Sequence, residues 1–243
     1  MKSKTKPKRR VENITLAKNN NSLAVFVINL DRAKDRLSRM RARLKEIGLG
    51  YERIKAVDGA VCDLDMAAVV DRKKHLLAHG KHILKNEVAC SLSHVLAMEK
   101  FLETKAHAAL ILEDDMRFNA GFVEVVQALM KRGDWDVVKL NGAHGGGKIR
   151  AQKLAGKYRL VKNAFHQSRT GAYVLTRAAA EKYVKKLLPV WLPLDHEMFK
   201  YWKYGLRGFS VDPFPSREEG SPSTIGYQNE KSRRLPAWKK LPS

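Results

Sequence analysis

Three consecutive carboxylates are the feature of this sequence with the most specific chemistry. Glu113, Asp114 and Asp115 directly follow an uninterrupted apolar run at residues 108–112. Such a run is typical of a buried parallel strand, and open α/β sheets bind their ligands at the carboxyl ends of strands. Because alternate residues of an extended backbone share a face, we expect Glu113 and Asp115 to project together and Asp114 to point away.

Two oxygen ligands in this position suit a hard divalent cation, Mn²⁺ or Mg²⁺, which keeps coordination positions open for substrate phosphates. The alternative is that these carboxylates cap a helix or lie solvated in a turn. The pattern alone leaves both interpretations open.

The elements around the carboxylates predict an α/β fold. The apolar, β-branched run at 23–30 predicts a buried strand, and apolar residues spaced by three and four predict a helix that begins after Asp31 as N-cap and ends at Gly48. A second strand follows at 51–57, so the chain opens with a β-α-β unit of the kind that builds parallel sheets. We therefore expect a mostly parallel central sheet flanked by helices.

The same patterns predict later elements. A helix from Glu87 to about Thr104 would be capped by Asn86, and a second helix is expected over residues 177–187. Further strands are expected at 136–140 and 171–175. The ordered domain is predicted to span residues 22–226, between a basic, disordered arm at 1–21 and a basic tail at 227–243.

The net charge predicts a phosphate-bearing partner. The chain of 243 residues has 47 Lys and Arg against 25 Asp and Glu, a net charge of +22. A nucleotide substrate, an anionic membrane or nucleic acid would each satisfy this charge. Nucleic-acid binding without catalysis is the main alternative function, but the sequence has no RNA-recognition motif, paired zinc ligands or basic zipper.

Cysteine content and hydropathy bear on the cellular compartment. Cys62 and Cys90 are too few for a disulfide framework, which favours a reducing, cytoplasmic compartment. The short apolar run at 23–28 meets Asn29 and no cleavage site, so we do not expect export, and no run is long enough to span a bilayer. His94 lies one turn after Cys90, but without a second ligand pair a zinc site is not expected.

Several ordered blocks resemble glycosyltransferase family 25, the bacterial lipopolysaccharide glycosyltransferases related to the collagen galactosyltransferases. The blocks cover roughly residues 23–226 in the expected order and read VINLDR (27–32), DR (35–36), AVDG (56–59), EVACSLSH (87–94), ILEDD (111–115), GAY (171–173), PLD (193–195) and STI (223–225). The resemblance implies a GT-A-like nucleotide-diphospho-sugar transferase fold. It also implies transfer of a sugar, commonly galactose from UDP-galactose, usually with inversion and with Mn²⁺ or Mg²⁺.

The resemblance also implies roles for individual residues. Glu113 and Asp115 would hold the metal, with Asp114 in reserve. Contacts to the nucleotide-sugar donor are expected from Asn29, Leu30, Arg32, Arg36, Asp58, Gly59, Ser93, His94, Asp114 and Lys148. For several of these a structural role is the alternative, such as a solvated Arg36, a turn at Gly59 or a buried His94 bonded to a carbonyl.

Lys148 belongs to a glycine-rich segment, residues 142–148, that fits part of a phosphate-binding loop. The next residue is Ile149 and not Ser or Thr, so the hydroxyl that holds Mg²⁺ in P-loop enzymes is missing. We expect instead a flexible loop near the sugar from which Lys148 approaches the pyrophosphate.

Asp195 is the expected general base that activates the acceptor hydroxyl. It is the acid of the PLD block, and the open alternatives are a metal or donor ligand and a helix cap, with Glu197 as a substitute base. The acceptor would be an oligosaccharide or a lipid-linked saccharide of lipopolysaccharide or lipooligosaccharide. We expect the basic arm to hold the protein on the anionic inner-membrane surface, unless it is only a solvated or expression-derived tail.

Overall fold

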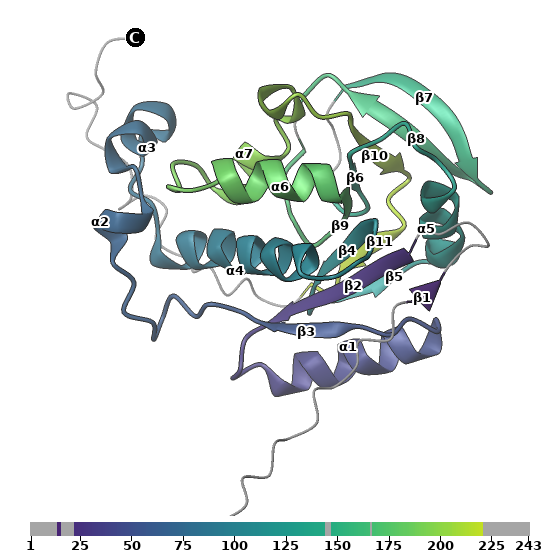
Figure 1. The fold of residues 1–243 in the computed structure, drawn as a ribbon, viewed down its shortest axis with the longest axis horizontal. Coiled ribbons are helices and arrows are strands. Elements are labelled where there is room, and N and C mark those ends of the chain that lie inside the picture. Colours follow the sequence, from purple (N-terminus) through teal and green to yellow (C-terminus); the bar gives the residue numbers. More distant parts are fainter. Residues whose placement is uncertain (1–13, 16–21, 144–146, 166, 221–243) are drawn as a thin grey trace, which may run out of the picture.

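The computed structural model describes residues 14–15, 22–143, 147–165 and 167–220. Its centre is a nine-stranded sheet with the order β1-β2-β4-β9-β6-β10-β8-β7, with β3 paired to β2 as a branch (Figure 1). The strands of this sheet are β1 (Ile14–Thr15), β2 (Ser22–Asn29), β3 (Glu52–Lys55), β4 (Ala108–Glu113), β6 (Val137–Lys139), β7 (Lys148–Ala155), β8 (Tyr158–Asn163), β9 (Ala172–Thr176) and β10 (Gly208–Asp212).

Most strands of the described sheet run in one direction. Followed across the sheet, the pairings show one direction for β2, β3, β4, β6, β7 and β10. The opposite direction is taken by β1, β8 and β9. The predicted α/β fold with a mostly parallel central sheet is therefore confirmed. A separate two-stranded ribbon consists of β5 (Met116–Phe118) and β11 (Ser216–Glu218).

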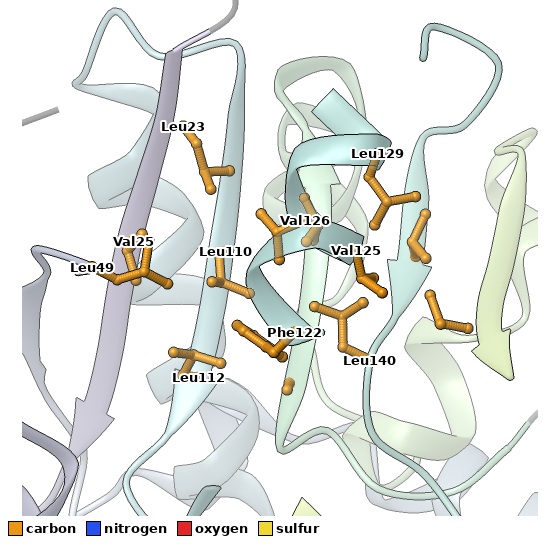
Figure 2. Close-up of a cluster of buried hydrophobic side chains, with 14 of the residues drawn as sticks. Leu23, Val25, Leu49, Leu110, Leu112, Phe122, Val125, Val126, Leu129 and Leu140 are labelled. Atoms are coloured by element: carbon orange, nitrogen blue, oxygen red, sulfur yellow. The ribbon is translucent and has the colours of Figure 1, made fainter. Parts of the chain in front are cut away.

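Helices cover both faces of the sheet (Figure 1). Alternate residues of β2 explain how. Val25 packs in one apolar cluster with α1 (Lys34–Glu46) and α5 (Phe122–Met130), while Phe26 packs in another with α4 (Lys85–Leu102) and α6 (Arg177–Lys186). Figure 2 shows the first cluster, in which Phe122 and Val126 of α5 lie beside Leu110 and Leu112 of β4. The remaining helices are α2 (Met66–Val69), α3 (Arg72–His79), α7 (Leu194–Met198) and a 3₁₀ turn η1 (Tyr201–Tyr204).

The two predicted helix caps are wrong. Helix α1 begins after Ala33 without a side-chain cap, and Asp31 instead forms ion pairs with Arg53 and Lys55. Asn86 lies inside α4, whose N-cap is Leu84, and the side chain of Glu87 accepts a hydrogen bond from the Leu84 N–H. Both helices start close to where periodicity placed them, because their buried faces determine where they lie.

The predicted arm and tail fall almost entirely outside the described residues. Within the arm, Ile14–Thr15 pairs with the start of β2, opposite Leu23 and Ser22. The predicted domain end at 226, the basic tail and the STI block also lie outside the described residues. Among the residues that are described, no helix is long and apolar enough to cross a membrane.

Candidate active site

A cavity of about 470 Å³ opens where β2 and β4 end. The two strands are parallel and in register, with Ile28 opposite Glu113, so the residues after both strands meet at one edge of the sheet. The cavity is lined by twelve of the residues that the sequence pointed to: Asn29, Leu30, Arg32, Arg36, Asp58, Gly59, Ser93, His94, Glu113, Asp114, Asp115 and Asp195.

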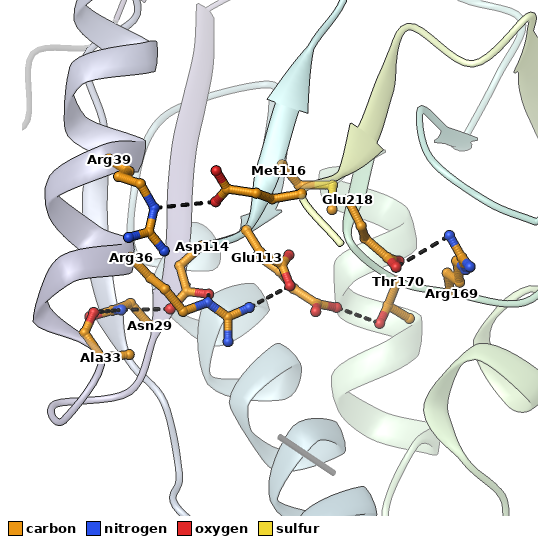
Figure 3. A network of polar contacts seen from close by, with 12 residues as sticks. Asn29, Ala33, Arg36, Arg39, Glu113, Asp114, Met116, Arg169, Thr170 and Glu218 are labelled. Atoms are coloured by element: carbon orange, nitrogen blue, oxygen red, sulfur yellow. Dashed lines mark hydrogen bonds and ion pairs between the residues drawn. The ribbon is translucent and has the colours of Figure 1, made fainter. Parts of the chain in front are cut away.

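Arg36 from α1 binds two of the three consecutive carboxylates (Figure 3). Its Nε lies 2.9 Å from Asp114 Oδ1, and its NH2 group contacts Asp115 Oδ2. Asp114 also accepts a 2.6 Å hydrogen bond from the buried Asn29 amide. Asp114 is therefore held in place by β2 and α1, whereas Asp115 has the guanidinium as its charge partner.

The predicted alternation of the three carboxylates is wrong. Strand β4 ends at Glu113 and the chain turns at Asp114 and Asp115, so the period of two does not extend past Glu113. Asp114 lines the same cavity as the other two. Glu113 lies on the other side of the cluster, where it accepts a 2.7 Å hydrogen bond from Thr170 Oγ1 (Figure 3).

The crowding of negative charge changes the ionisation of this cluster. Burial and the neighbouring Glu113 charge raise the pKa of Asp115 to about 7, against the opposing Arg36 charge. Burial also raises the pKa of Asp114. For Glu113 burial acts in the same direction, but the neighbouring His94 and Thr170 and the Arg36 charge outweigh it and lower its pKa.

The residues fit the expected divalent cation. Asp115 Oδ1 is buried and has no hydrogen-bond partner among the described residues, a state that costs free energy unless a ligand satisfies it. It lies close enough to Glu113 that the two charges perturb each other. A cation held by both carboxylates would satisfy the oxygen and cancel the repulsion, and carboxylate oxygens are the ligands that Mn²⁺ and Mg²⁺ take.

The loop after β3 forms the next wall of the cavity. Asp58 accepts a 2.6 Å hydrogen bond from Arg32 Nε, which lowers the pKa of Asp58. Ser93 on α4 accepts a 2.9 Å bond from the Val57 N–H and so fixes the loop. Gly59 is needed because a Cβ there would come within 2.8 Å of the Lys85 backbone. The described contacts of Ser93 and Gly59 thus position Asp58.

Asp195 lines the same cavity as the carboxylate cluster and belongs to α7. It lies in the first turn of this helix, whose N-cap is Pro193, so it is not the cap. Its Oδ2 accepts a 2.9 Å hydrogen bond from the backbone N–H of Arg169. Glu197 does not line the cavity; it is buried and accepts bonds from Lys203 and Tyr204. A substitute base at Glu197 is therefore not supported.

The loop at 167–170 links Asp195 to Glu113, and sequence reasoning missed what holds it. Lys139, only 1% exposed, donates hydrogen bonds to the carbonyls of Gln167, Ser168 and Arg169 and lies 3.5 Å from the Phe199 ring centroid. Arg169 has φ 75°, a conformation unusual for a non-glycine residue. The signal in the sequence was a lysine inside the apolar strand at 136–140.

Removing the Lys139 ammonium is expected to release this loop. Lys139→Met keeps most of the side-chain volume but leaves three carbonyls without their buried donor, so the free energy of unfolding should fall by about 2–4 kcal/mol. Amide exchange at Arg169 and Thr170 should accelerate. Lys148→Met is the matched control, because it breaks an exposed ion pair worth at most about 1 kcal/mol. Equal denaturation midpoints for the two variants would contradict the role of Lys139.

Lys148 is the one predicted site residue that the structure does not bring to the cavity. It starts β7 and pairs with Asp212 at 2.6 Å. Residues that the sequence analysis did not name do line the cavity, including Thr170, Arg169 and Glu218, and Glu218 forms an ion pair with Arg169 at 3.2 Å (Figure 3). Thr170 precedes the GAY block, which was its only sequence signal.

Comparison with known proteins identifies relatives of this chain. It is 29% identical to procollagen galactosyltransferase 1 of Danio rerio over 83% of this chain and 37% of the relative. It is 31% identical to human inactive glycosyltransferase 25 family member 3, over 78% of this chain and 35% of that protein. The chain thus spans about a third of the length of these relatives.

Among solved structures, a glycosyltransferase involved in the glycosylation of the major capsid of PBCV-1 matches with a TM-score of 0.46 at 12% identity. That match covers 83% of this chain and 94% of the other. The family model described as glycosyltransferase family 25 (LPS biosynthesis protein) matches residues 22–198, which include the carboxylate cluster and Asp195. The chain belongs to glycosyltransferase family 25.

Proposed function

We propose that this chain is a metal-dependent glycosyltransferase that transfers galactose from UDP-galactose to a lipopolysaccharide or lipooligosaccharide acceptor, with inversion. The observation that supports this most strongly is the cavity at the ends of β2 and β4. It combines Glu113, two arginines and Asp195 with a buried carboxylate oxygen of Asp115 that has no hydrogen-bond partner in the described part of the chain. Metal-assisted transfer from a nucleoside diphosphate sugar uses groups of these kinds, a cation held by carboxylates and a carboxylate base, which supports the proposal.

Glu113 and Asp115 hold Mn²⁺ or Mg²⁺ in this proposal. When bound, the cation supplies Lewis-acid neutralisation of the charge that grows on the departing diphosphate. Arg36 keeps Asp115 in place, and Arg32, half exposed at the mouth, is available to the donor phosphates. Asp58, which also lines the cavity, accepts hydrogen bonds from the ribose or the base in this proposal.

Asp195 is the general base. The acceptor hydroxyl attacks the anomeric carbon, the bond from that carbon to the diphosphate oxygen breaks, and the hydroxyl proton passes to the Asp195 carboxylate. The hydrogen bond from the Arg169 N–H fixes the orientation of this carboxylate. Attack from the face opposite the leaving UDP inverts the anomeric configuration.

Galactose is proposed because relatives of this chain have names that specify galactosyltransferases. The family description names LPS biosynthesis, which supports the acceptor class. Because some relatives have names that describe them as inactive, activity itself needs a direct test. Transfer of labelled galactose from UDP-galactose to a truncated lipooligosaccharide, with the product anomer read by NMR, tests donor, acceptor and stereochemistry together. Absence of any labelled product across a set of truncated acceptors would contradict the proposed acceptor class.

A protein with a lipid-linked acceptor has to bind at a membrane surface. In this proposal the basic arm binds that surface by electrostatic attraction to anionic lipids. Six basic residues lie among the first ten, outside the described residues. At about 1 kcal/mol per charge near an anionic surface, they suffice for reversible, salt-sensitive attachment. Deletion of residues 1–10 is expected to lower co-sedimentation with anionic vesicles at least about tenfold while leaving neutral vesicles unaffected. Unchanged co-sedimentation would leave the arm without this role.

A further inference from the structure

A second group of metal-ligating side chains lies in the wall of the cavity. Cys90 and His94 are one turn apart on α4, and Glu113 ends the neighbouring strand β4. The ligand atoms of these three residues all lie within 4.8 Å of one another. The third ligand, which the sequence pattern lacked, is thus supplied by the fold.

The imidazole of His94 is oriented toward this group. His94 is 1% exposed, its Nδ1 lies 2.9 Å from the Tyr173 hydroxyl, and the two rings stack. Nε2 has no hydrogen-bond partner among the described residues and lies 3.5 Å from Glu113 Oε1. A contact from the other ring nitrogen to a neighbouring polar group is the usual way in which proteins orient a metal-binding histidine.

The chemistry of the three ligands differs from that of the Glu113 and Asp115 pair. A thiolate and an imidazole favour a borderline, thiophilic cation such as Zn²⁺ over Mn²⁺ or Mg²⁺. Three protein ligands leave a fourth tetrahedral position, and all three residues line the cavity, so that position is accessible from it. To bind Zn²⁺ the three atoms must approach one another to separations of about 3.5 Å, a movement of about 1 Å from the upper limit of 4.8 Å.

We propose that Cys90, His94 and Glu113 form a binding site for a thiophilic divalent cation such as Zn²⁺. The site opens into the same cavity. Binding replaces the thiol proton of Cys90, which leaves to solvent, and uses neutral His94 and ionised Glu113. Because Glu113 serves both sites, Zn²⁺ here displaces the cation that the proposed transfer reaction uses. This last consequence rests on the proposed function, whereas binding itself does not.

Cobalt substitution tests the site directly. Co²⁺ bound by a thiolate gives a charge-transfer absorption band in the near ultraviolet, which cysteine-free coordination lacks. The full-length wild-type protein is expected to develop this band with a stoichiometry of one Co²⁺ per chain. The band should disappear when Zn²⁺ is added, because Zn²⁺ replaces Co²⁺. Cys90→Ser should abolish the band, whereas Cys62→Ser, which removes an exposed cysteine that does not line the cavity, should keep it.

A second variant tests the orientation of His94. Tyr173→Phe removes only the hydroxyl beside Nδ1 and should weaken Zn²⁺ binding, measured by competition with a chromophoric chelator, about tenfold or more. Circular dichroism verifies that each variant is folded. A wild-type protein without the thiolate band, or a band that Cys62→Ser abolishes, would overturn the proposed site.

The activity readout separates this proposal from the proposed function. Zn²⁺ is expected to inhibit Mn²⁺-dependent transfer competitively with Mn²⁺ in wild type and in Cys62→Ser. In Cys90→Ser, the Zn²⁺ concentration that halves that variant's own uninhibited rate should be at least about tenfold higher. Transfer activity without a thiolate band overturns the thiophilic site and leaves the transferase intact. The band without transfer supports the site and contradicts the transferase.

Discussion

Asp115→Asn is expected to lower metal-dependent transfer at least about 10³-fold, because the cation supplies several kcal/mol of stabilisation to the leaving diphosphate. Asparagine keeps the shape of the side chain but removes the charge that holds the cation. The measurement is the initial rate of transfer over a Mn²⁺ titration. Asp212→Asn is the matched control, since it neutralises a carboxylate that pairs with Lys148 away from the cavity.

The same substitution should stabilise the metal-free protein. The pKa of Asp115 is raised to about 7 in the folded chain by burial and the Glu113 charge, above its ordinary value of 3.8. The folded state therefore holds a proton between about pH 4 and pH 7 that the unfolded chain has lost, so this group lowers stability as the pH rises through that window. At pH 8 Asp115→Asn should be more stable than wild type by about 4 kcal/mol, since each pKa unit of the rise corresponds to about 1.4 kcal/mol, and near pH 4 the difference should vanish.

Denaturant unfolding at the two pH values, with and without Mn²⁺, measures this effect. Mn²⁺ should raise the midpoint of wild type at pH 8 and leave that of Asp115→Asn unchanged. A variant that turns over donor at the wild-type rate with the same Mn²⁺ dependence would contradict the assignment of Asp115 as a ligand. A variant less stable than wild type at pH 8 would show that Arg36, and not repulsion within the cluster, determines the energy of Asp115.

Asp195→Asn should reduce transfer by a factor of about 10²–10⁴, the range that a general base contributes. The amide oxygen can still accept the hydrogen bond from the Arg169 N–H, so the loop and the cavity should be preserved. Affinity for UDP and Mn²⁺, measured by calorimetry, is expected to stay within about twofold of wild type. The rate should fall without a change in binding.

Two other outcomes would assign Asp195 differently. Loss of metal-dependent UDP binding would make it a ligand, and near-normal transfer would leave it with the structural hydrogen bond to Arg169. Glu197→Gln is the control on the same helix, because that carboxylate is buried against Lys203 and Tyr204. Glu197→Gln should lower the free energy of unfolding but leave the Asp195 carboxylate in place. Comparing the two variants therefore distinguishes an effect of destabilising α7 from an effect of losing the general base.

The sequence predicted those parts of the fold that depend on local patterns. The buried run at 23–30 became β2, and the run at 108–112 became β4, because fully buried parallel strands have continuous apolar sequences. Periodicity located α4 and α6 to within two residues. The antiparallel insertion of β9 between β4 and β6 was not predicted, since strand direction depends on how distant segments pair.

The candidate site was predictable in its members and not in its geometry. Family blocks identified twelve residues that line the cavity, but the turn after Glu113 brought Asp114 to Arg36 instead of away from the site. Lys139 was missed because its partners are backbone carbonyls about thirty residues later in the chain, which no local pattern reveals. Long-range contacts of this kind position the groups whose chemistry the sequence indicates.

Release of UDP from a panel of UDP-sugars without acceptor, with and without Mn²⁺, tests the central claim most directly. The proposed metal-dependent transferase predicts slow hydrolysis that requires Mn²⁺ or Mg²⁺, is fastest with UDP-galactose, and is lost in Asp115→Asn but not in Asp212→Asn. Donor hydrolysis that persists in the presence of a chelator, or the absence of both hydrolysis and UDP binding for every sugar in the panel, would contradict it.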